Sequence, residues 1–189
     1  MRGQAYTLEA VIASVLLVSS LVFALQVTAV TPLSASTSNQ HIENQQRASA
    51  SGVLTAAQKA GALKDAVLYW NDGEAEFHDA ERVTYYTNSY PPNEFGSITA
   101  RAFDGRGLAV NVLVYHNESE EPSRMVYRGE PSDNAVSASR TVTIYNGSEL
   151  AGTSTTVENA TSFDEVVPYD GTGGTVYNVV RVEVTVWRM

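Results

Sequence analysis

The sequence predicts an α+β protein in which a long N-terminal membrane-spanning helix is followed by a single antiparallel β-sheet domain. Three observations predict this fold. From Ala10 to Gln40 there is no charged side chain. Residues 53–67 carry apolar side chains at three- and four-residue spacing, which is typical of a helix with one buried face. Beyond residue 80, apolar and polar side chains alternate, which is typical of strands.

The charge-free segment is long enough to cross a membrane. Residues 4–31 are predicted to form the transmembrane helix, because about 20 apolar residues span a bilayer core of ~30 Å. Arg2 is the only flanking cation and lies on the N-terminal side, so we expect a cytoplasmic N-terminus and an extracellular C-terminal domain. A cleaved secretory signal peptide is the alternative. The apolar run exceeds the ~7–15 residues of such peptides, and Val27-Thr28-Ala29 is a weak cleavage site.

The residues at the start of the chain carry a resemblance. Arg2-Gly3-Gln4 is followed by Thr7-Leu8-Glu9 and an unbroken apolar helix. Over residues 2–30 this arrangement resembles the class III signal peptide of archaeal type IV pilin-like proteins, including archaellins. The resemblance implies that a prepilin peptidase cuts between Gly3 and Gln4 and removes a leader of residues 1–3. It also implies that the helix then packs against like or related pilin subunits. The family usually carries its Glu at the fifth mature position, whereas Glu9 would be the sixth.

Glu9 has two interpretations. A carboxylate deep in a bilayer costs ~2.5 kcal/mol or more and therefore needs a partner. The resemblance implies that this partner is the N-terminal ammonium of a neighbouring subunit. Alternatively, Glu9 lies at headgroup depth in the first helical turns, where an acid complements the positive end of the helix dipole. The sequence leaves both interpretations open.

A helical stalk is predicted over residues 32–61. Thr31-Pro32 predicts a hinge or a new helix start, since Thr can cap a helix and Pro can occupy its first position. The stalk is polar on nearly all sides up to residue 52, whereas from Val53 its apolar face is expected to dock on the domain. Gly61 predicts a break before a short helix over residues 63–70.

Residues 62–189 are predicted to form the extracellular β-rich domain. Asn71-Asp72-Gly73 predicts a turn that ends the helical part. The predicted strands are residues 82–87, 97–103, 107–115, 123–128, 135–145 and 176–187, the last of which is expected to be central. Residues 97–103 and 107–115 are predicted to pair as a hairpin, and Asn146-Gly147 predicts a second hairpin turn. We expect residues 152–174 to be the most mobile loop, and Arg140 to reach a sheet edge or a carboxylate.

The composition excludes several classes of function. The net charge is −9, with 21 acidic against 12 basic side chains, and Lys59 and Lys64 are the only lysines. This acid-rich surface resembles that of proteins from halophilic archaea, in which salt screens self-repulsion. No basic stripe with interleaved aromatics is present, so we expect no nucleic-acid binding. The chain has no cysteine, which excludes disulfides and cysteine-based metal sites.

No catalytic motif is recognisable in the sequence. We therefore expect neither an enzyme nor a cofactor, and no small-molecule substrate is identified. His41, His78 and His116 match no metal-ligand spacing and are predicted to be solvated. The acidic turn formed by His78-Asp79 beside Glu74 and Glu76 is a weak candidate for a divalent-cation site.

Three asparagines begin acceptor sequences for N-glycosylation: Asn117, Asn146 and Asn159. The aromatic side chains of Tyr69-Trp70, Tyr85-Tyr86 and Trp187 either form a binding surface or fill the core, and a sheet domain normally buries them.

Two classes of function remain. The first is a structural or accessory subunit of a type IV pilus-like filament or pseudopilus. The second is a monomeric membrane-anchored binding domain for a sugar, an envelope component or a partner protein.

Overall fold

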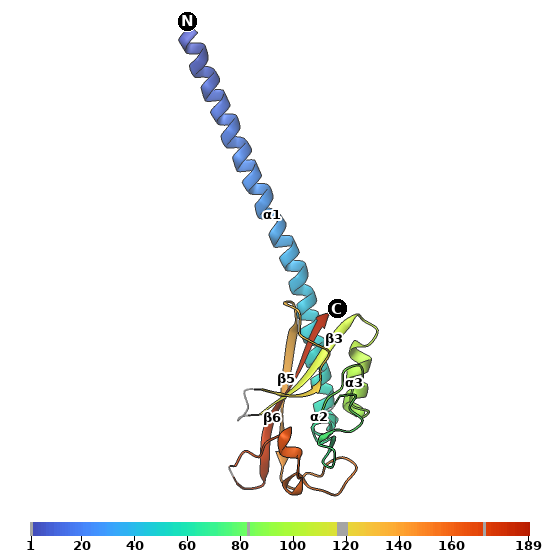
Figure 1. Cartoon of the computed structure of the whole chain (residues 1–189). Helices are drawn as coiled ribbons and strands as arrows, with labels where there is room; N and C mark the ends of the chain where they lie inside the picture. Colours follow the sequence, from blue (N-terminus) through green and yellow to red (C-terminus); the bar gives the residue numbers. More distant parts are fainter. Residues whose placement is uncertain (1, 83, 117–120, 172) are drawn as a thin grey trace. The chain divides into compact units, whose positions relative to one another are not determined.

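The computed structural model describes residues 2–82, 84–116, 121–171 and 173–189; within the first helix it describes side chains at residues 6–25 and from residue 40 onward. The chain divides into two compact units, Met1–Ile42 and Glu43–Met189. Helix α1 (Arg2–Lys59) contributes residues to both (Figure 1). Thr31-Pro32, predicted as a hinge or a helix start, lies inside the helical backbone of α1.

The first unit is helical and apolar. Every side chain from Tyr6 to Leu25 is exposed, and this segment is long and apolar enough to span a membrane. The hydroxyls of Ser14, Ser19 and Ser20 donate hydrogen bonds of 2.7–2.8 Å to helix carbonyl oxygens three or four residues earlier. These serines therefore satisfy their hydrogen bonds within the helix, as an apolar environment requires.

The second unit is built on a four-stranded antiparallel sheet in the order β4-β3-β6-β5. Its strands are β3 (Leu108–Tyr115), β4 (Ser123–Val126), β5 (Val136–Tyr145) and β6 (Val176–Arg188). Strand β6 is central, as predicted, and pairs with both β3 and β5. A two-stranded sheet joins β1 (Trp70–Asn71) to β2 (Glu76–Phe77). The α+β class is thus confirmed, with two antiparallel sheets rather than one.

One face of the large sheet carries the core. Alternate valines of β3 and β6 are fully buried there, together with the C-terminal part of α1, helix α2 (Ala62–Val67) and helix α3 (Glu94–Phe103). Val53, Leu54 and Ala57 of α1 belong to this core, so the predicted docking of residues 53 onward is confirmed. Gly61 adopts a left-handed conformation (φ 78°) between α1 and α2, which confirms the predicted break.

The prediction of a strand over residues 97–103 is wrong, because this segment belongs to α3. Asn93 caps that helix, since its side chain accepts a hydrogen bond of 3.1 Å from the Gly96 N–H. Phe95, Thr99 and Phe103 are buried at four-residue spacing, which is the period of a helix. The predicted hairpin with residues 107–115 therefore does not form, although β3 itself is confirmed.

The prediction of a strand over residues 82–87 is also wrong for the described part of that segment; Val83 lies outside the described residues. The Glu81 carboxylate accepts hydrogen bonds from the backbone N–H groups of Thr87 (3.0 Å) and Asn88 (2.6 Å). These bonds curl the segment into a loop. Tyr86 retains a single bridge to Val126 at the edge of β4.

The other face of the sheet is partly covered by the connection from β4 to β5. These strands lie at opposite edges, so the connection must cross β3 and β6. Asn111 of β3 fixes this crossing, because its side chain accepts from the Arg128 N–H (2.8 Å) and donates to the Gly129 carbonyl (2.9 Å). Asn111 is only 1% exposed, and these two bonds satisfy its amide.

Arg140 lies on β5, which is an edge strand of the large sheet, and its side chain contacts helix α1 rather than a carboxylate. Its guanidinium donates to the hydroxyls of Thr55 (3.0 Å) and Ser51 (3.3 Å).

Asn146-Gly147 forms a turn, with the Ser148 N–H donating to the Tyr145 carbonyl (2.8 Å). The predicted hairpin is wrong, because β5 pairs with the distant β6 instead.

The segment predicted as the most mobile loop, residues 152–174, packs against the core in its described part. It contains two short 3₁₀ helices, η1 (Val157–Asn159) and η2 (Phe163–Glu165). Val157, Phe163 and Val167 are buried. Of the aromatic side chains considered for a binding surface, Trp70, Tyr86 and Trp187 are buried, whereas Tyr69 and Tyr85 are half-buried.

Candidate functional site

The sequence-predicted assembly residues lie together at the start of α1. Gly3 and Gln4 belong to its helical backbone, and the Gln4 side chain lies outside the described residues. The Glu9 side chain is exposed. Ile12 and Ala13, which follow it by three and four positions, are apolar neighbours on the same helix face. Glu9 is thus the one charged side chain between Tyr6 and Leu25, on a helix surface that is mainly apolar.

The predicted glycosylation residues differ in their surroundings. Asn117 lies outside the described residues. Asn159 is exposed, and its Nδ2 donates to Thr156 Oγ1 (2.7 Å). Asn146 is half-buried; its Nδ2 donates to the Gly174 carbonyl (3.1 Å), whereas its Oδ1 is buried without a partner among the described residues. Asn159 therefore offers the more accessible amide of these two.

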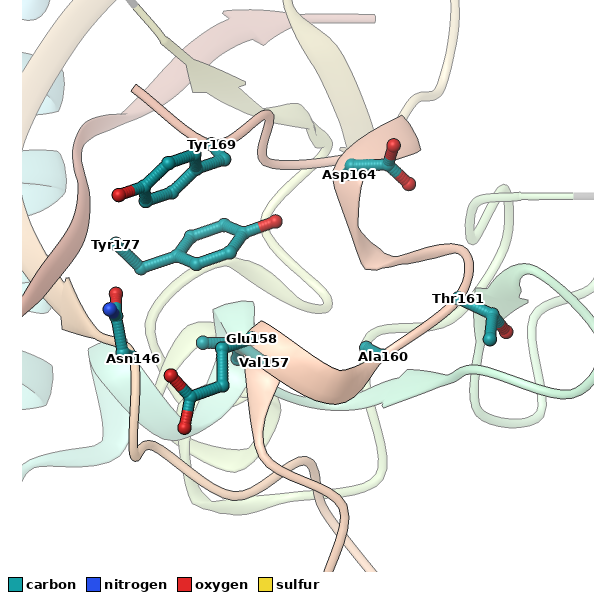
Figure 2. A pocket seen from close by; sticks show the side chains of 8 residues that line it. All are labelled: Asn146, Val157, Glu158, Ala160, Thr161, Asp164, Tyr169 and Tyr177. Carbon is teal, nitrogen blue, oxygen red and sulfur yellow. The ribbon is translucent and has the colours of Figure 1, made fainter. Parts of the chain in front are cut away.

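A pocket of about 420 Å³ lies beside Asn146, between the turn after β5 and the start of β6 (Figure 2). This volume is within the range of small-molecule sites. Its polar lining consists of two carboxylates, an amide, an aliphatic hydroxyl and two phenols: Glu158, Asp164, Asn146, Thr161, Tyr169 and Tyr177. Val157 contributes a buried apolar side chain. No cationic side chain is among the described residues that line the pocket.

The two tyrosines form an aromatic wall of this pocket. Their ring centroids lie 5.4 Å apart with an interplanar angle of 51°, and Phe163 supports Tyr177 at 5.8 Å. Tyr177 is buried, whereas Tyr169 is 42% exposed. Burial, and then the nearby Asp164 carboxylate, raise the pKa of the Tyr177 hydroxyl. The hydroxyl therefore remains protonated and can donate a hydrogen bond.

Backbone hydrogen bonds hold the pocket segments in place. The Asn146 N–H donates to the Thr175 carbonyl (3.0 Å), and the Asp170 N–H donates to the Tyr177 carbonyl (3.1 Å). Asp72 anchors the opposite wall through Thr161. The sequence identified Asn146 as a turn residue and a sequon and did not point to either tyrosine, because the pocket forms from segments whose contacts are set by the tertiary fold.

The histidines occupy different environments. His41 is exposed, as predicted. His78 is half-buried rather than solvated: its ring packs against Tyr69 at 4.9 Å, and Nε2 lies 3.1 Å from the Ala151 carbonyl oxygen. His116 is also half-buried. Among the residues that the structure describes, no group of three or more His, Cys, Asp or Glu side chains could hold a metal ion.

The fold defines an α+β protein with an N-terminal helix apolar enough to span a membrane, followed by antiparallel sheets. The chain belongs to a family of unknown function, DUF7288, whose model matches residues 2–186. The match includes both the apolar helix and the sheet domain. No curated protein and no solved structure matches the chain.

Proposed function

We propose that the chain is a structural or accessory, minor pilin-like subunit of a cell-surface type IV pilus-like filament or pseudopilus. The observation that carries this proposal is the exposed apolar surface of α1, which includes the acidic residue Glu9. From Tyr6 to Leu25 the helix exposes apolar side chains on every side, and Glu9 is the one acid among them. Arg2-Gly3-Gln4 stands directly before this segment. The domain would lie outside the cell, with the N-terminus on the cytoplasmic side.

A helix with such a surface must be covered. Twenty exposed residues of this kind are stable in lipid or against other apolar helices, and not in water. Lipid alone would leave the Glu9 carboxylate without a partner if it lies inside the bilayer. Cleavage after Gly3 would give Gln4 a free ammonium, and the ammonium of a neighbouring subunit would pair with Glu9. Assembly would thus satisfy both the apolar surface and the charge.

A variant of Glu9 tests the assembly step. We expect Glu9→Ala to leave membrane insertion and N-terminal processing intact, while weakening association between subunits in native membranes. Intramembrane polar contacts are typically worth ~0.6–2 kcal/mol, and repetition along a filament would multiply this effect. Association is measured by cross-linking in intact membranes.

Ser14→Ala is the matched control, because the Ser14 hydroxyl bonds within its own helix. It should cross-link like the unmodified chain. Equal cross-linking of the Glu9→Ala and Ser14→Ala variants would contradict a role for Glu9 in assembly.

A monomeric, single-span, membrane-anchored extracellular binding domain is the second candidate. The pocket beside Asn146 favours it, because a preformed cavity with convergent polar groups and an exposed aromatic ring suits a ligand. Only the filament subunit requires cleavage after Gly3 and a helix that packs on copies of itself. The state of the N-terminus in native membranes therefore separates the two candidates.

A further inference from the structure

We infer that the pocket lined by Glu158, Asp164, Tyr169 and Tyr177 binds a neutral sugar. This inference goes beyond the proposed function and stands under either candidate, because the pocket lies within residues 146–177 of the second unit. Its basis is the combination of an exposed ring, two hydrogen-bond-accepting carboxylates and the absence of a cation from the described lining.

The aromatic wall provides the apolar contact. A sugar ring has a face of C–H groups, which packs on an aromatic ring, while its hydroxyls project around the edge. Tyr169 is 42% exposed and lies against the buried Tyr177, so one ring is available and the other fixes it in place (Figure 2). An exposed aromatic ring of this kind contributes a large contact area with little loss of side-chain entropy.

The polar groups select the ligand class. Glu158 and Asp164 are exposed carboxylates, which accept hydrogen bonds from hydroxyls and repel anions. The Tyr177 hydroxyl lies near Asp164 and is protonated, so it donates. A polyhydroxylated neutral molecule matches this mixture of acceptors, donor and ring better than a phosphate, a fatty chain or a free carboxylate does.

Two of the sequence-predicted glycosylation residues lie at the same pocket. Asn146 contributes to its lining, and Asn159 lies between the lining residues Glu158 and Ala160. The sugar therefore has two possible sources: a glycan attached to this chain at Asn146 or Asn159, or a saccharide from elsewhere. Both present the same chemistry to Tyr169, and the experiment must distinguish them.

The first arm uses the full chain from a host without N-glycosylation, held in a detergent that carries no sugar. Saturation-transfer NMR measures binding of D-glucose, D-galactose, D-mannose and N-acetyl-D-glucosamine. We expect at least one to bind. Tyr169→Ala should weaken that binding about tenfold, whereas Tyr169→Phe, which keeps the ring, should stay within about twofold.

Glu158→Gln serves as a second pocket variant, since Glu158 is exposed and its replacement should not affect folding. Tyr145→Ala is the matched control: Tyr145 is 48% exposed and does not line the pocket. Binding that is equally weakened by Tyr145→Ala and Tyr169→Ala would overturn the assignment. Tighter binding of tetramethylammonium than of every sugar would also overturn it, because the pocket would then be a cation site.

The second arm uses protein from native membranes and maps glycopeptides by mass spectrometry. A glycan on Asn146 or Asn159, with a thermal midpoint that falls on enzymatic deglycosylation in the unmodified chain but not in Tyr169→Ala, would identify the attached glycan as the occupant. Sugar binding by the unglycosylated chain would identify a saccharide from elsewhere. No sugar binding in the first arm, together with no such glycan in the second, would overturn the inference.

Discussion

Asp72 fixes Ser162, a residue 90 positions later in the chain. The Asp72 carboxylate accepts from the Ser162 backbone N–H at 2.7 Å, and it also accepts from the Thr161 N–H at 2.8 Å. The Ser162 hydroxyl in turn accepts from the buried Trp70 indole (3.0 Å). The turn Asn71-Asp72-Gly73 thereby holds the wall of the sugar pocket against the aromatic core.

Replacing Asp72 by Ala should therefore destabilise the second unit. We expect a loss of about 1–2 kcal/mol, because two backbone donors lose a charged acceptor that is partly screened by solvent. Urea unfolding followed by tryptophan fluorescence measures this loss in the full chain, since both tryptophans, Trp70 and Trp187, are buried in the second unit.

The matched control for this variant is Asp133→Ala. Asp133 is exposed and makes no hydrogen bond or ion pair with other described residues. The Asp133→Ala variant removes the same charge as Asp72→Ala but breaks no hydrogen bond. Its unfolding midpoint should therefore stay close to that of the unmodified chain. Equal effects of the two variants would show that the Asp72 hydrogen bonds contribute nothing measurable.

The loop closed by Glu81 should make stability depend on pH. Hydrogen bonds from the Thr87 hydroxyl and the Asn88 N–H are the main causes that lower the pKa of Glu81 to about 2, from 4.5. Because the folded-state pKa is depressed, the stabilisation is fully present above pH 4.5 and is lost as the pH falls through about 2. Glu81→Gln should lower stability at pH 7 and make little difference at pH 2. A stability difference that does not change with pH would contradict this linkage.

Two glycine substitutions should have opposite effects. A Cβ atom at Gly96 would lie 1.9 Å from the Pro91 carbonyl oxygen, whereas a Cβ at Gly52 would meet no atom within 4 Å. Gly96→Ala should destabilise by about 1–3 kcal/mol, because α3 must shift away from rigid backbone. Gly52→Ala should stabilise by up to about 1 kcal/mol through helix propensity. Unfolding midpoints that move in the same direction would be inconsistent with these packing distances.

The boundary of the folded domain can be tested with two fragments. The predicted boundary at residue 62 omits four core side chains of α1: Ala50, Val53, Leu54 and Ala57. A fragment of residues 43–189 should unfold cooperatively. A fragment of residues 62–189 should be less stable by more than about 3 kcal/mol, since the loss of one buried leucine alone costs ~2–5 kcal/mol. Equal midpoints for both fragments would show that α1 adds nothing to the core.

The strong periodic patterns could be interpreted from sequence alone. Strand β6 alternates four fully buried valines with polar or exposed neighbours, and this alternation predicted both its existence and its central position. The apolar run of α1 was equally clear. Residues 97–103 were misassigned because the β-branched Ile98 and Thr99 favour a strand, whereas the Asn93 cap and the four-residue spacing of buried side chains favour a helix.

The candidate sugar site could not be predicted from the sequence, for a different reason. Its walls are joined by long-range hydrogen bonds, such as those from Thr161 to Asp72, and no local pattern encodes such contacts. The spacing of Tyr169 and Tyr177 predicts neither that their rings meet nor that Asp164 lies beside them. The sequence signals near this pocket were the sequons at Asn146 and Asn159 and the turn at Asn146-Gly147, and none of them indicates a cavity.

The intact mass of the protein from native membranes tests most directly whether the chain is a processed, pilin-like subunit, as we propose. A prepilin peptidase should remove Met1–Gly3, so the measured mass should correspond to a chain that begins at Gln4. Gly3→Val is the matched variant, which should block this loss without preventing membrane insertion. An N-terminus that is intact, with or without loss of Met1 alone, would contradict the claim and favour the membrane-anchored binding domain.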